Sequence, residues 1–212
     1  MDLSSPISSV IPSAHGAVLV VLARTTEPLS GRKVAELTNG KVSQKQANNV
    51  LGELSEAGVV LRESRPPANL YRLNRDHVAA EGIRALSDMW GRLVQRIRDD
   101  ISLWEAPVLS ACLFASAARG EASTGSDIDV LLVRDEDGGS TEEAEQQWLD
   151  QVERLSERIT AWSGNPCELL ELTPVELQAA ALREDRLVRD LRRDAILLVG
   201  VDVRDLLRKP RA

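Results

Sequence analysis

The sequence predicts an α+β protein: a helical N-terminal region that ends in a hairpin, a long connecting helix, and a small mixed β-sheet flanked by helices. Three observations predict this class. Apolar residues recur at helical spacing in several short segments of the first 58 residues, and again without interruption from 74 to 104. After residue 105, short apolar runs typical of buried strands are separated by further amphipathic stretches.

Composition and charge limit the classes of partner that this protein is expected to bind. The chain has 212 residues, of which 43% are hydrophobic and 28% charged, as in ordinary globular proteins. No apolar run approaches the ~20 residues that cross a bilayer, so we expect no membrane partner and a cytoplasmic location. The net charge of −7 is unevenly spread, with +2 in residues 1–74 and −9 in the remainder. Any nucleic-acid surface is therefore expected in the first third.

The N-terminal region predicts three helices. The first covers residues 12–25, and the second begins after Ser30 and ends at Asn39-Gly40, where glycine permits a left-handed turn. Ser43 begins the third helix and forms a capping box with Gln46. One face of this helix is apolar, and the other carries groups that reach base edges and phosphates: Ser43, Gln44, Lys45, Asn48 and Asn49.

A basic hairpin follows the third helix. Two short strands, 59–62 and 70–73, flank a turn predicted at 63–68, and the arms carry Arg62, Arg65 and Arg72. Three helices followed by such a hairpin is the order of a winged helix, in which one helix enters the major groove of DNA and the wing follows the backbone. The alternative is a small helical domain that binds protein or dimerises.

A long amphipathic stretch connects this region to the rest. From 74 to 104 one stripe of apolar residues recurs at steps of three and four, which predicts a connecting helix. The stripe is explained equally by the seam of a homodimer and by packing onto the following domain.

Two carboxylates stand at the start of a predicted strand. Residues 107–114 form a buried strand, and Asp127 and Asp129 alternate with Ile128 and Val130 further on. Residues i and i+2 of a strand share a face, so both carboxylates converge about 6–7 Å apart. Paired carboxylates with water and phosphate oxygens suit octahedral Mg²⁺ (or Mn²⁺).

The segment LFASAARGEASTGSDIDVLLV resembles the DNA polymerase β-type nucleotidyltransferases. The phrase ELSEAGVVLRES…YRLN resembles the recognition helix and wing of MarR- and ArsR-like regulators, and the whole layout is similar to bacterial fusions of the two. The resemblance implies a winged helix-turn-helix DNA-binding domain (1–74), a connecting helix (75–104) and a nucleotidyltransferase domain (105–212). The implied activity moves NMP from an NTP to an acceptor (protein, RNA or small molecule) and releases pyrophosphate.

The resemblance also implies residue roles. Ser116 and Ser126 would contact the nucleotide, and Arg119 would neutralise phosphate or brace the loop. Asp127 and Asp129 would hold the metal ions, with a third carboxylate from the predicted strand 166–172. Glu168 is the first choice by position, although Glu171 on the other face is the alternative.

One position departs from the family pattern. Ala115 stands where the family has glycine, at a place where backbone approaches phosphate. The alternative function is therefore a DNA-binding regulator whose nucleotidyltransferase-like domain is inactive and senses nucleotide or mediates dimerisation.

The C-terminal part predicts a helix over 141–162, a helix capped by Thr173, a strand at 196–200 and a tail from Leu206. The stretch 184–193 is rich in Arg and Asp at helical spacing, which predicts a solvated helix face with ion pairs or, alternatively, a grip on an acceptor nucleic acid. Cys112 and Cys167 have no neighbours at zinc-ligand spacing and are expected to be buried, reduced thiols rather than a disulfide or metal site.

Overall fold

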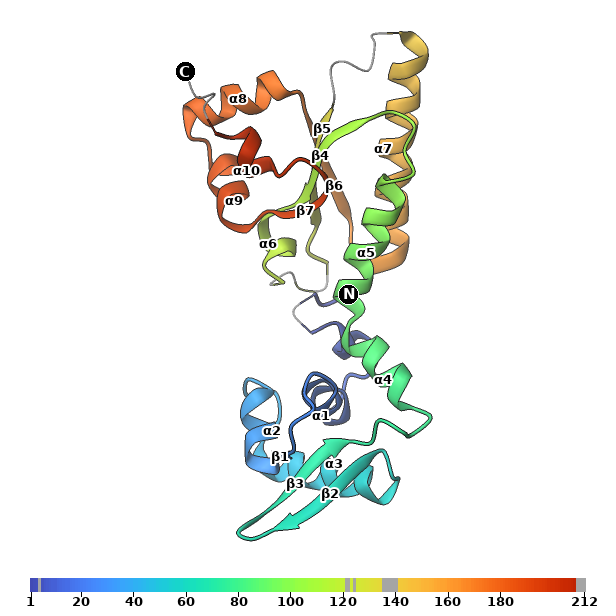
Figure 1. The fold of residues 1–212 in the computed structure, drawn as a ribbon, viewed down its shortest axis with the longest axis vertical. Helices are drawn as coiled ribbons and strands as arrows, with labels where there is room; N and C mark the ends of the chain where they lie inside the picture. The colour runs from blue at the N-terminus through green and yellow to red at the C-terminus, as the bar shows by residue number, and fades with distance from the viewer. Residues whose placement is uncertain (4, 121–122, 124, 135–140, 209–212) are drawn as a thin grey trace. The chain divides into compact units, whose positions relative to one another are not determined.

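A computed structural model describes residues 1–3, 5–120, 123, 125–134 and 141–208. The predicted α+β class is confirmed: helices surround one three-stranded and one four-stranded sheet (Figure 1). Contacts divide the chain into two compact units, one of residues 5–90 with Asp2 and one of residues 91–208 with Met1 and Leu3. We describe each unit by itself.

The N-terminal unit has the layout that the sequence predicts, three helices and a hairpin. Its sheet is antiparallel in the order β1-β3-β2, and its core lies between the sheet and α1 to α4. In chain order the elements are η1 (Pro6–Ser9), α1 (Ala14–Ala23), β1 (Leu29–Ser30), α2 (Gly31–Leu37), α3 (Gln44–Glu56), β2 (Val60–Arg65), β3 (Ala68–Leu73) and α4 (Ala80–Ser87).

Local capping explains where these helices begin. The Ser30 hydroxyl accepts from the Lys33 backbone N–H, and Ser43 and Gln46 form both halves of the predicted capping box. The hairpin turn differs from the expected 63–68, because β2 continues to Arg65 and pairs with Ala68. The turn is therefore shorter than composition suggests: Glu63 and Ser64 are polar but face solvent on an edge strand, where polar residues are tolerated.

The connecting helix is interrupted. The structure has α4 and then α5 (Met89–Ile101), with Asp88 between them at φ −111° and ψ 24°. The Ser87 hydroxyl donates to the Arg84 carbonyl, and Ser and Asp side chains commonly compete in this way with helical backbone bonding. The apolar stripe is buried within the single chain, with Ile83 in the N-terminal core and Ile97 0% exposed in the C-terminal unit. Packing thus accounts for the stripe without a second copy.

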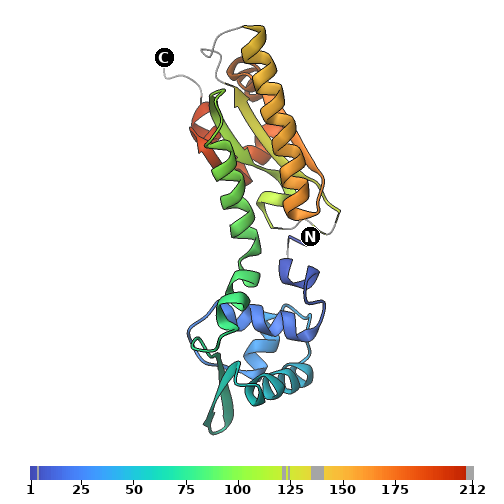
Figure 2. The ribbon, with the colours of Figure 1, turned by 90° about the vertical axis from the view of Figure 1, so that its right-hand side faces the viewer.

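The C-terminal unit is a mixed sheet in the order β6-β5-β4-β7, in which β5 and β6 are parallel and the other pairs antiparallel. Helices α5 and α7 lie side by side over one face, and α8, α9 and α10 cover the other (Figures 1 and 2). The elements after α5 are β4 (Val108–Leu113), α6 (Ala115–Ala118), β5 (Ile128–Arg134), α7 (Glu142–Ser163), β6 (Cys167–Leu172), α8 (Pro174–Arg183), α9 (Arg186–Asp194), β7 (Ile196–Gly200) and α10 (Val203–Leu206).

Several smaller predictions can be checked in this unit. Thr173 and Glu176 form a capping box, and α9 carries the ion pairs Arg186–Asp190 and Arg193–Asp190. The segment expected to be a tail includes Leu207, which is 3% exposed; residues 209–212 lie outside the described part. No helix in the described residues is long and apolar enough to cross a membrane.

Candidate functional site

Three carboxylates gather where β5 and β6 begin. Asp127 immediately precedes β5, Asp129 is its second residue, and Glu168 is the second residue of β6. Because β5 and β6 are parallel with Asp129 opposite Glu168, these two carboxylates start from backbones only about 4.8 Å apart. Strand alternation places both on the sheet face of Leu131 and Leu170, the face that α8 to α10 cover.

The pKa of Asp129 is affected by burial and also by the neighbouring carboxylates. Partial burial raises the pKa of Asp129 above its usual value, and the negative charges of Glu168 and then Asp127 raise it further. Among the described residues, no positively charged side chain contributes to the shift of the Asp129 pKa. Within the described residues, however, no group of three or more His, Cys, Asp or Glu side chains is arranged closely enough to hold a metal ion. A metal would require the exposed Asp127 and Glu168 side chains to rotate inward.

The two candidates for the third carboxylate lie on opposite faces of β6. Glu168 lies beside Asp129, whereas Glu171 accepts a hydrogen bond from the indole N–H of Trp148 on α7. Trp148 in turn packs edge-on against Trp104, with ring centroids 5.7 Å apart. Glu171 is therefore held in the contact between β6 and α7, away from Asp129.

Ser116 belongs to α6, the short helix that follows β4 and that Figure 1 shows at one end of the sheet. The backbone N–H of Phe114 donates to the Asp129 carbonyl at 3.1 Å, so α6 begins directly beside the carboxylates. Ala115 has φ +54°, in the left-handed region that favours glycine. The backbone thus has a conformation that suits glycine, and the alanine Cβ is strained there.

Arg119 pairs with a carboxylate from a different helix. Its guanidinium lies 2.6 Å from the carboxylate of Asp194, the last residue of α9, and Arg193 contacts the same carboxylate at 2.7 Å. Hydrogen bonds from Arg193 and Arg119 hold the pKa of Asp194 down at about 2. Of the two roles predicted for Arg119, this geometry favours bracing: the ion pair ties the end of α6 to α9.

A buried asparagine in the turn before β6 holds Ser123 and Ser126, which lie shortly before Asp127. Asn165 is 0% exposed, and its side-chain amide donates to the Ser123 carbonyl at 3.3 Å and the Ser126 carbonyl at 3.0 Å. The Ser126 hydroxyl, predicted to contact the nucleotide, accepts a hydrogen bond from the Ser123 backbone N–H. The turn sequence Gly-Asn-Pro gives no signal for this role, because the partners are about 40 residues away.

Both cysteines lie in strands of this sheet as free thiols; Cys112 is buried as expected, whereas Cys167 is only half-buried. Burial raises the pKa of Cys112 to about 12, and burial with the charge of Asp129 raises that of Cys167 to about 12. Both thiols are therefore protonated at neutral pH and poor nucleophiles.

The predicted nucleic-acid surface lies in the N-terminal unit. All five predicted residues at the start of α3 are exposed, as are Arg62, Arg65 and Arg72 on the hairpin. Asn48 packs against α2: a Cβ added to Gly31 would lie 1.8 Å from the Asn48 side-chain oxygen. Arg65 pairs with Glu63 at 2.7 Å on the same strand. No hydrogen bond or ion pair joins the remaining side chains to another described residue: Gln44, Lys45, Asn49, Arg62 and Arg72.

Comparison with known proteins bears on the C-terminal unit. Residues 94–189 match the family model of the nucleotidyltransferase domain. This region runs from within α5 into α9 and contains Ser116, Asp127, Asp129 and Glu168. No curated protein matches the chain.

Two solved structures show weaker likeness. One, described as the crystal structure of a toxin-antitoxin with AMP-PNP, is 15% identical over 56% of this chain and 80% of its own, with a TM-score of 0.32. The other, TrmBL2, an archaeal chromatin protein with a novel mode of DNA binding, is 12% identical over 88% of this chain and 76% of its own, with a TM-score of 0.31. Neither TM-score is high enough to indicate a shared overall fold.

Proposed function

We propose that the C-terminal unit binds an NTP and transfers its NMP group to an acceptor, with release of pyrophosphate. The observation that carries the proposal is the register of β5 and β6, which sets Asp129 opposite Glu168 beside the turn that bears Ser116. The match of residues 94–189 to the nucleotidyltransferase domain supports the same reaction class.

Asp127, Asp129 and Glu168 are the residues that would hold Mg²⁺ (or Mn²⁺). Their donor set of carboxylate oxygens fits a hard divalent cation; burial raises the pKa of Asp129 most, and the negative charges of Glu168 and Asp127, which a cation would neutralise, raise it further. When bound, the metal supplies Lewis-acid neutralisation of the phosphate oxygens. The exposed side chains of Asp127 and Glu168 are free to turn toward it.

Side chains of the C-terminal unit bind the phosphates and move the proton in the proposed reaction. Ser116, next to the strained turn, donates its hydroxyl to the terminal phosphates. Glu168 accepts the proton of the acceptor group as the acceptor oxygen or nitrogen bonds to the α-phosphorus, while the bond from that phosphorus to the bridging oxygen breaks and pyrophosphate leaves. Arg119, held by Asp194, keeps the α6 turn in place rather than contacting phosphate.

The test is transfer of label from each α-labelled NTP in the presence of Mg²⁺ and a cell lysate. The wild-type protein is expected to yield a labelled product, and Asp127→Asn/Asp129→Asn is expected to yield none. Glu153→Gln, which removes an exposed carboxylate from α7, is the matched control and retains activity. Absence of label with every NTP refutes the enzymatic proposal.

We further propose that α3 and the hairpin bind DNA as a winged helix. Lys45, Arg62 and the neighbouring polar side chains of α3 form an exposed surface in the only net-basic third of the sequence. The logarithm of the affinity for a mixed-sequence duplex is expected to fall linearly with log salt, and Lys45→Ala/Arg62→Ala is expected to weaken binding and to lower the slope by about 2. Arg84→Ala on α4 is the control. Unchanged affinity and slope in the double variant contradict this assignment.

The second candidate is a DNA-binding regulator that has lost catalysis. The strained Ala115 in place of glycine favours it, as does the lack of a closed metal-ligand group in the described residues. It predicts equilibrium binding of nucleotide without labelled product, so the same labelled NTPs distinguish the two candidates.

A further inference from the structure

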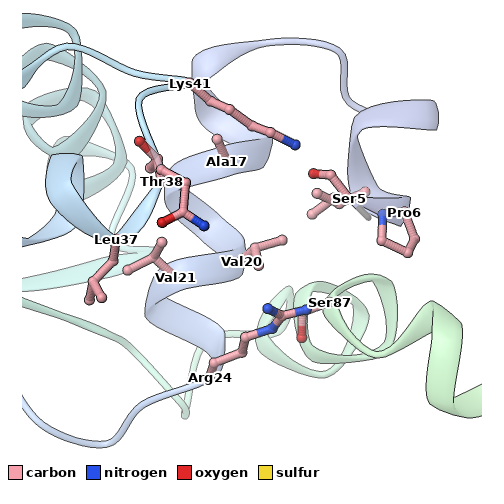
Figure 3. Close-up of a pocket in the computed structure, with 12 residues that line it drawn as sticks. Ser5, Pro6, Ala17, Val20, Val21, Arg24, Leu37, Thr38, Lys41 and Ser87 are labelled. Atoms are coloured by element: carbon pink, nitrogen blue, oxygen red, sulfur yellow. The ribbon is translucent and has the colours of Figure 1, made fainter. Parts of the chain in front are cut away.

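The N-terminal unit contains a small cavity whose lining includes none of the residues proposed to contact DNA. Its volume is about 90 Å³, and it is bounded by η1, α1, the turn after α2 and the end of α4 (Figure 3). One water needs about 10–15 Å³ of such space, so the cavity accommodates roughly six to nine non-hydrogen atoms. That is the size of a small organic molecule rather than of a nucleotide.

The lining combines an apolar wall with two cations. Ala17, Val20 and Val21 of α1 form the apolar wall. Figure 3 shows Ala17 and Val20 between the Lys41 ammonium on one side and the Arg24 guanidinium on the other. No carboxylate is among the lining residues. The cavity is therefore positive at two separated points and apolar between them.

The two cations are available for a ligand. In the described part of the chain, neither Arg24 nor Lys41 has a side-chain hydrogen bond or ion pair. The lining hydroxyls, in contrast, are engaged: Thr38 donates to the Ala35 carbonyl at 2.7 Å, and Ser87 donates to the Arg84 carbonyl at 2.8 Å. The polar groups left to bind a ligand are thus the two cations and the Asn39 amide, and of these only the cations favour an anionic ligand.

We propose that this cavity binds a small linear dicarboxylate, with one carboxylate on Lys41, the other on Arg24, and the methylene chain against α1. Charge-assisted hydrogen bonds to carboxylate are the strong kind, and Arg24 offers a planar pair of donors. A monocarboxylate of the same size satisfies only one cation. Succinate and glutarate match both the charge and the size of the cavity.

The position of the cavity gives binding a consequence for the neighbouring helix. Lys41 lies in the turn between α2 and α3, two residues before the Ser43 cap, so a bound dicarboxylate ties the start of α3 to α1. Ligand binding itself does not depend on DNA binding or on nucleotidyl transfer, and it is measured without DNA or NTP.

The experiment is titration calorimetry of the full chain with glutarate and, as the monoanionic counterpart, butyrate. We expect glutarate to bind with a dissociation constant of the order of 1 mM or tighter, and butyrate about tenfold more weakly. Arg24→Gln and Lys41→Gln are each expected to weaken glutarate binding about tenfold, whereas Arg32→Gln, an exposed α2 residue outside the cavity, leaves it unchanged.

A further variant and a second measurement distinguish binding in the cavity from misfolding of a variant and from non-specific binding. Ala17→Leu fills the apolar wall and is expected to abolish binding while both cations remain. Methyl resonances of Val20 and Val21 are expected to shift on titration with glutarate. The proposal is overturned if glutarate does not bind, if butyrate binds equally well, or if Arg24→Gln and Lys41→Gln bind like Arg32→Gln.

Discussion

The strained backbone at Ala115 makes a substitution to glycine a sharp test of the site's geometry. At φ +54° an alanine costs about 1–2 kcal/mol relative to a residue without Cβ. Glycine also gains freedom in the unfolded chain, which costs about 0.4–1 kcal/mol. Taking the middle of each range, Ala115→Gly is expected to stabilise the C-terminal unit by about 0.8 kcal/mol, or roughly 3 °C in melting temperature.

Ala118→Gly is the matched control, because it is the same substitution in the same short helix at a residue without positive φ. There glycine is expected to lower stability by about 0.5–1 kcal/mol, so the two variants move in opposite directions. Tryptophan fluorescence follows the transition, since Trp104, Trp148 and Trp162 all belong to the C-terminal unit. If Ala115→Gly lowers the melting temperature as Ala118→Gly does, the argument from backbone strain is wrong.

Three further predictions concern the carboxylates and their supports. Asn165→Ala removes three hydrogen bonds of the side-chain amide, which donates to the Ser123 and Ser126 carbonyls and accepts from the Met1 amino group, and is expected to cost about 2 kcal/mol in urea unfolding; a change below 0.5 kcal/mol contradicts this role of Asn165. Asp129→Asn removes one of the three neighbouring negative charges and is therefore expected to raise the free energy of unfolding at pH 7 in the presence of a chelator. A lower free energy of unfolding in this variant would contradict the proximity of the three carboxylates. The pKa of Asp194 is depressed to about 2, so its contribution is present above about pH 4 and disappears as pH falls toward 2. Wild type and Asp194→Asn should therefore differ at pH 6 and converge near pH 2, and a constant difference across that range excludes the ion pair as its source.

Features set by neighbouring residues could be predicted from the sequence. The capping boxes at Ser43 and Thr173 are local patterns, and the structure contains both. The alternation of Asp127 and Asp129 similarly placed both at the start of a strand. Boundaries were less predictable where polar residues lie in regular structure, as in β2, or where a side chain competes with helical bonding, as at Ser87.

Features set by distant pairing could not be predicted. Position in the sequence favours Glu168 over Glu171, but the register that sets Glu168 opposite Asp129 belongs to a parallel pair whose strands are separated by a whole helix. The partner of Arg119 is 75 residues away, and the partners of Asn165 about 40. Charge and polarity of these residues are visible in the sequence, but the residues that they meet are decided by how α7 and α9 pack.

The parallel pairing of β5 with β6 also makes the site depend on chain length. Only every second residue of a strand faces the same side, so deletion of a single residue between Gly164 and Glu168 would turn Glu168 toward α7. The sheet could still form, with every hydrophobic residue of β6 on the wrong face or with a neighbouring residue opposite Asp129. Such a deletion would remove a carboxylate from the site without replacing any acidic residue. The length of the connection before β6 is therefore as important for the site as the presence of Glu168 itself.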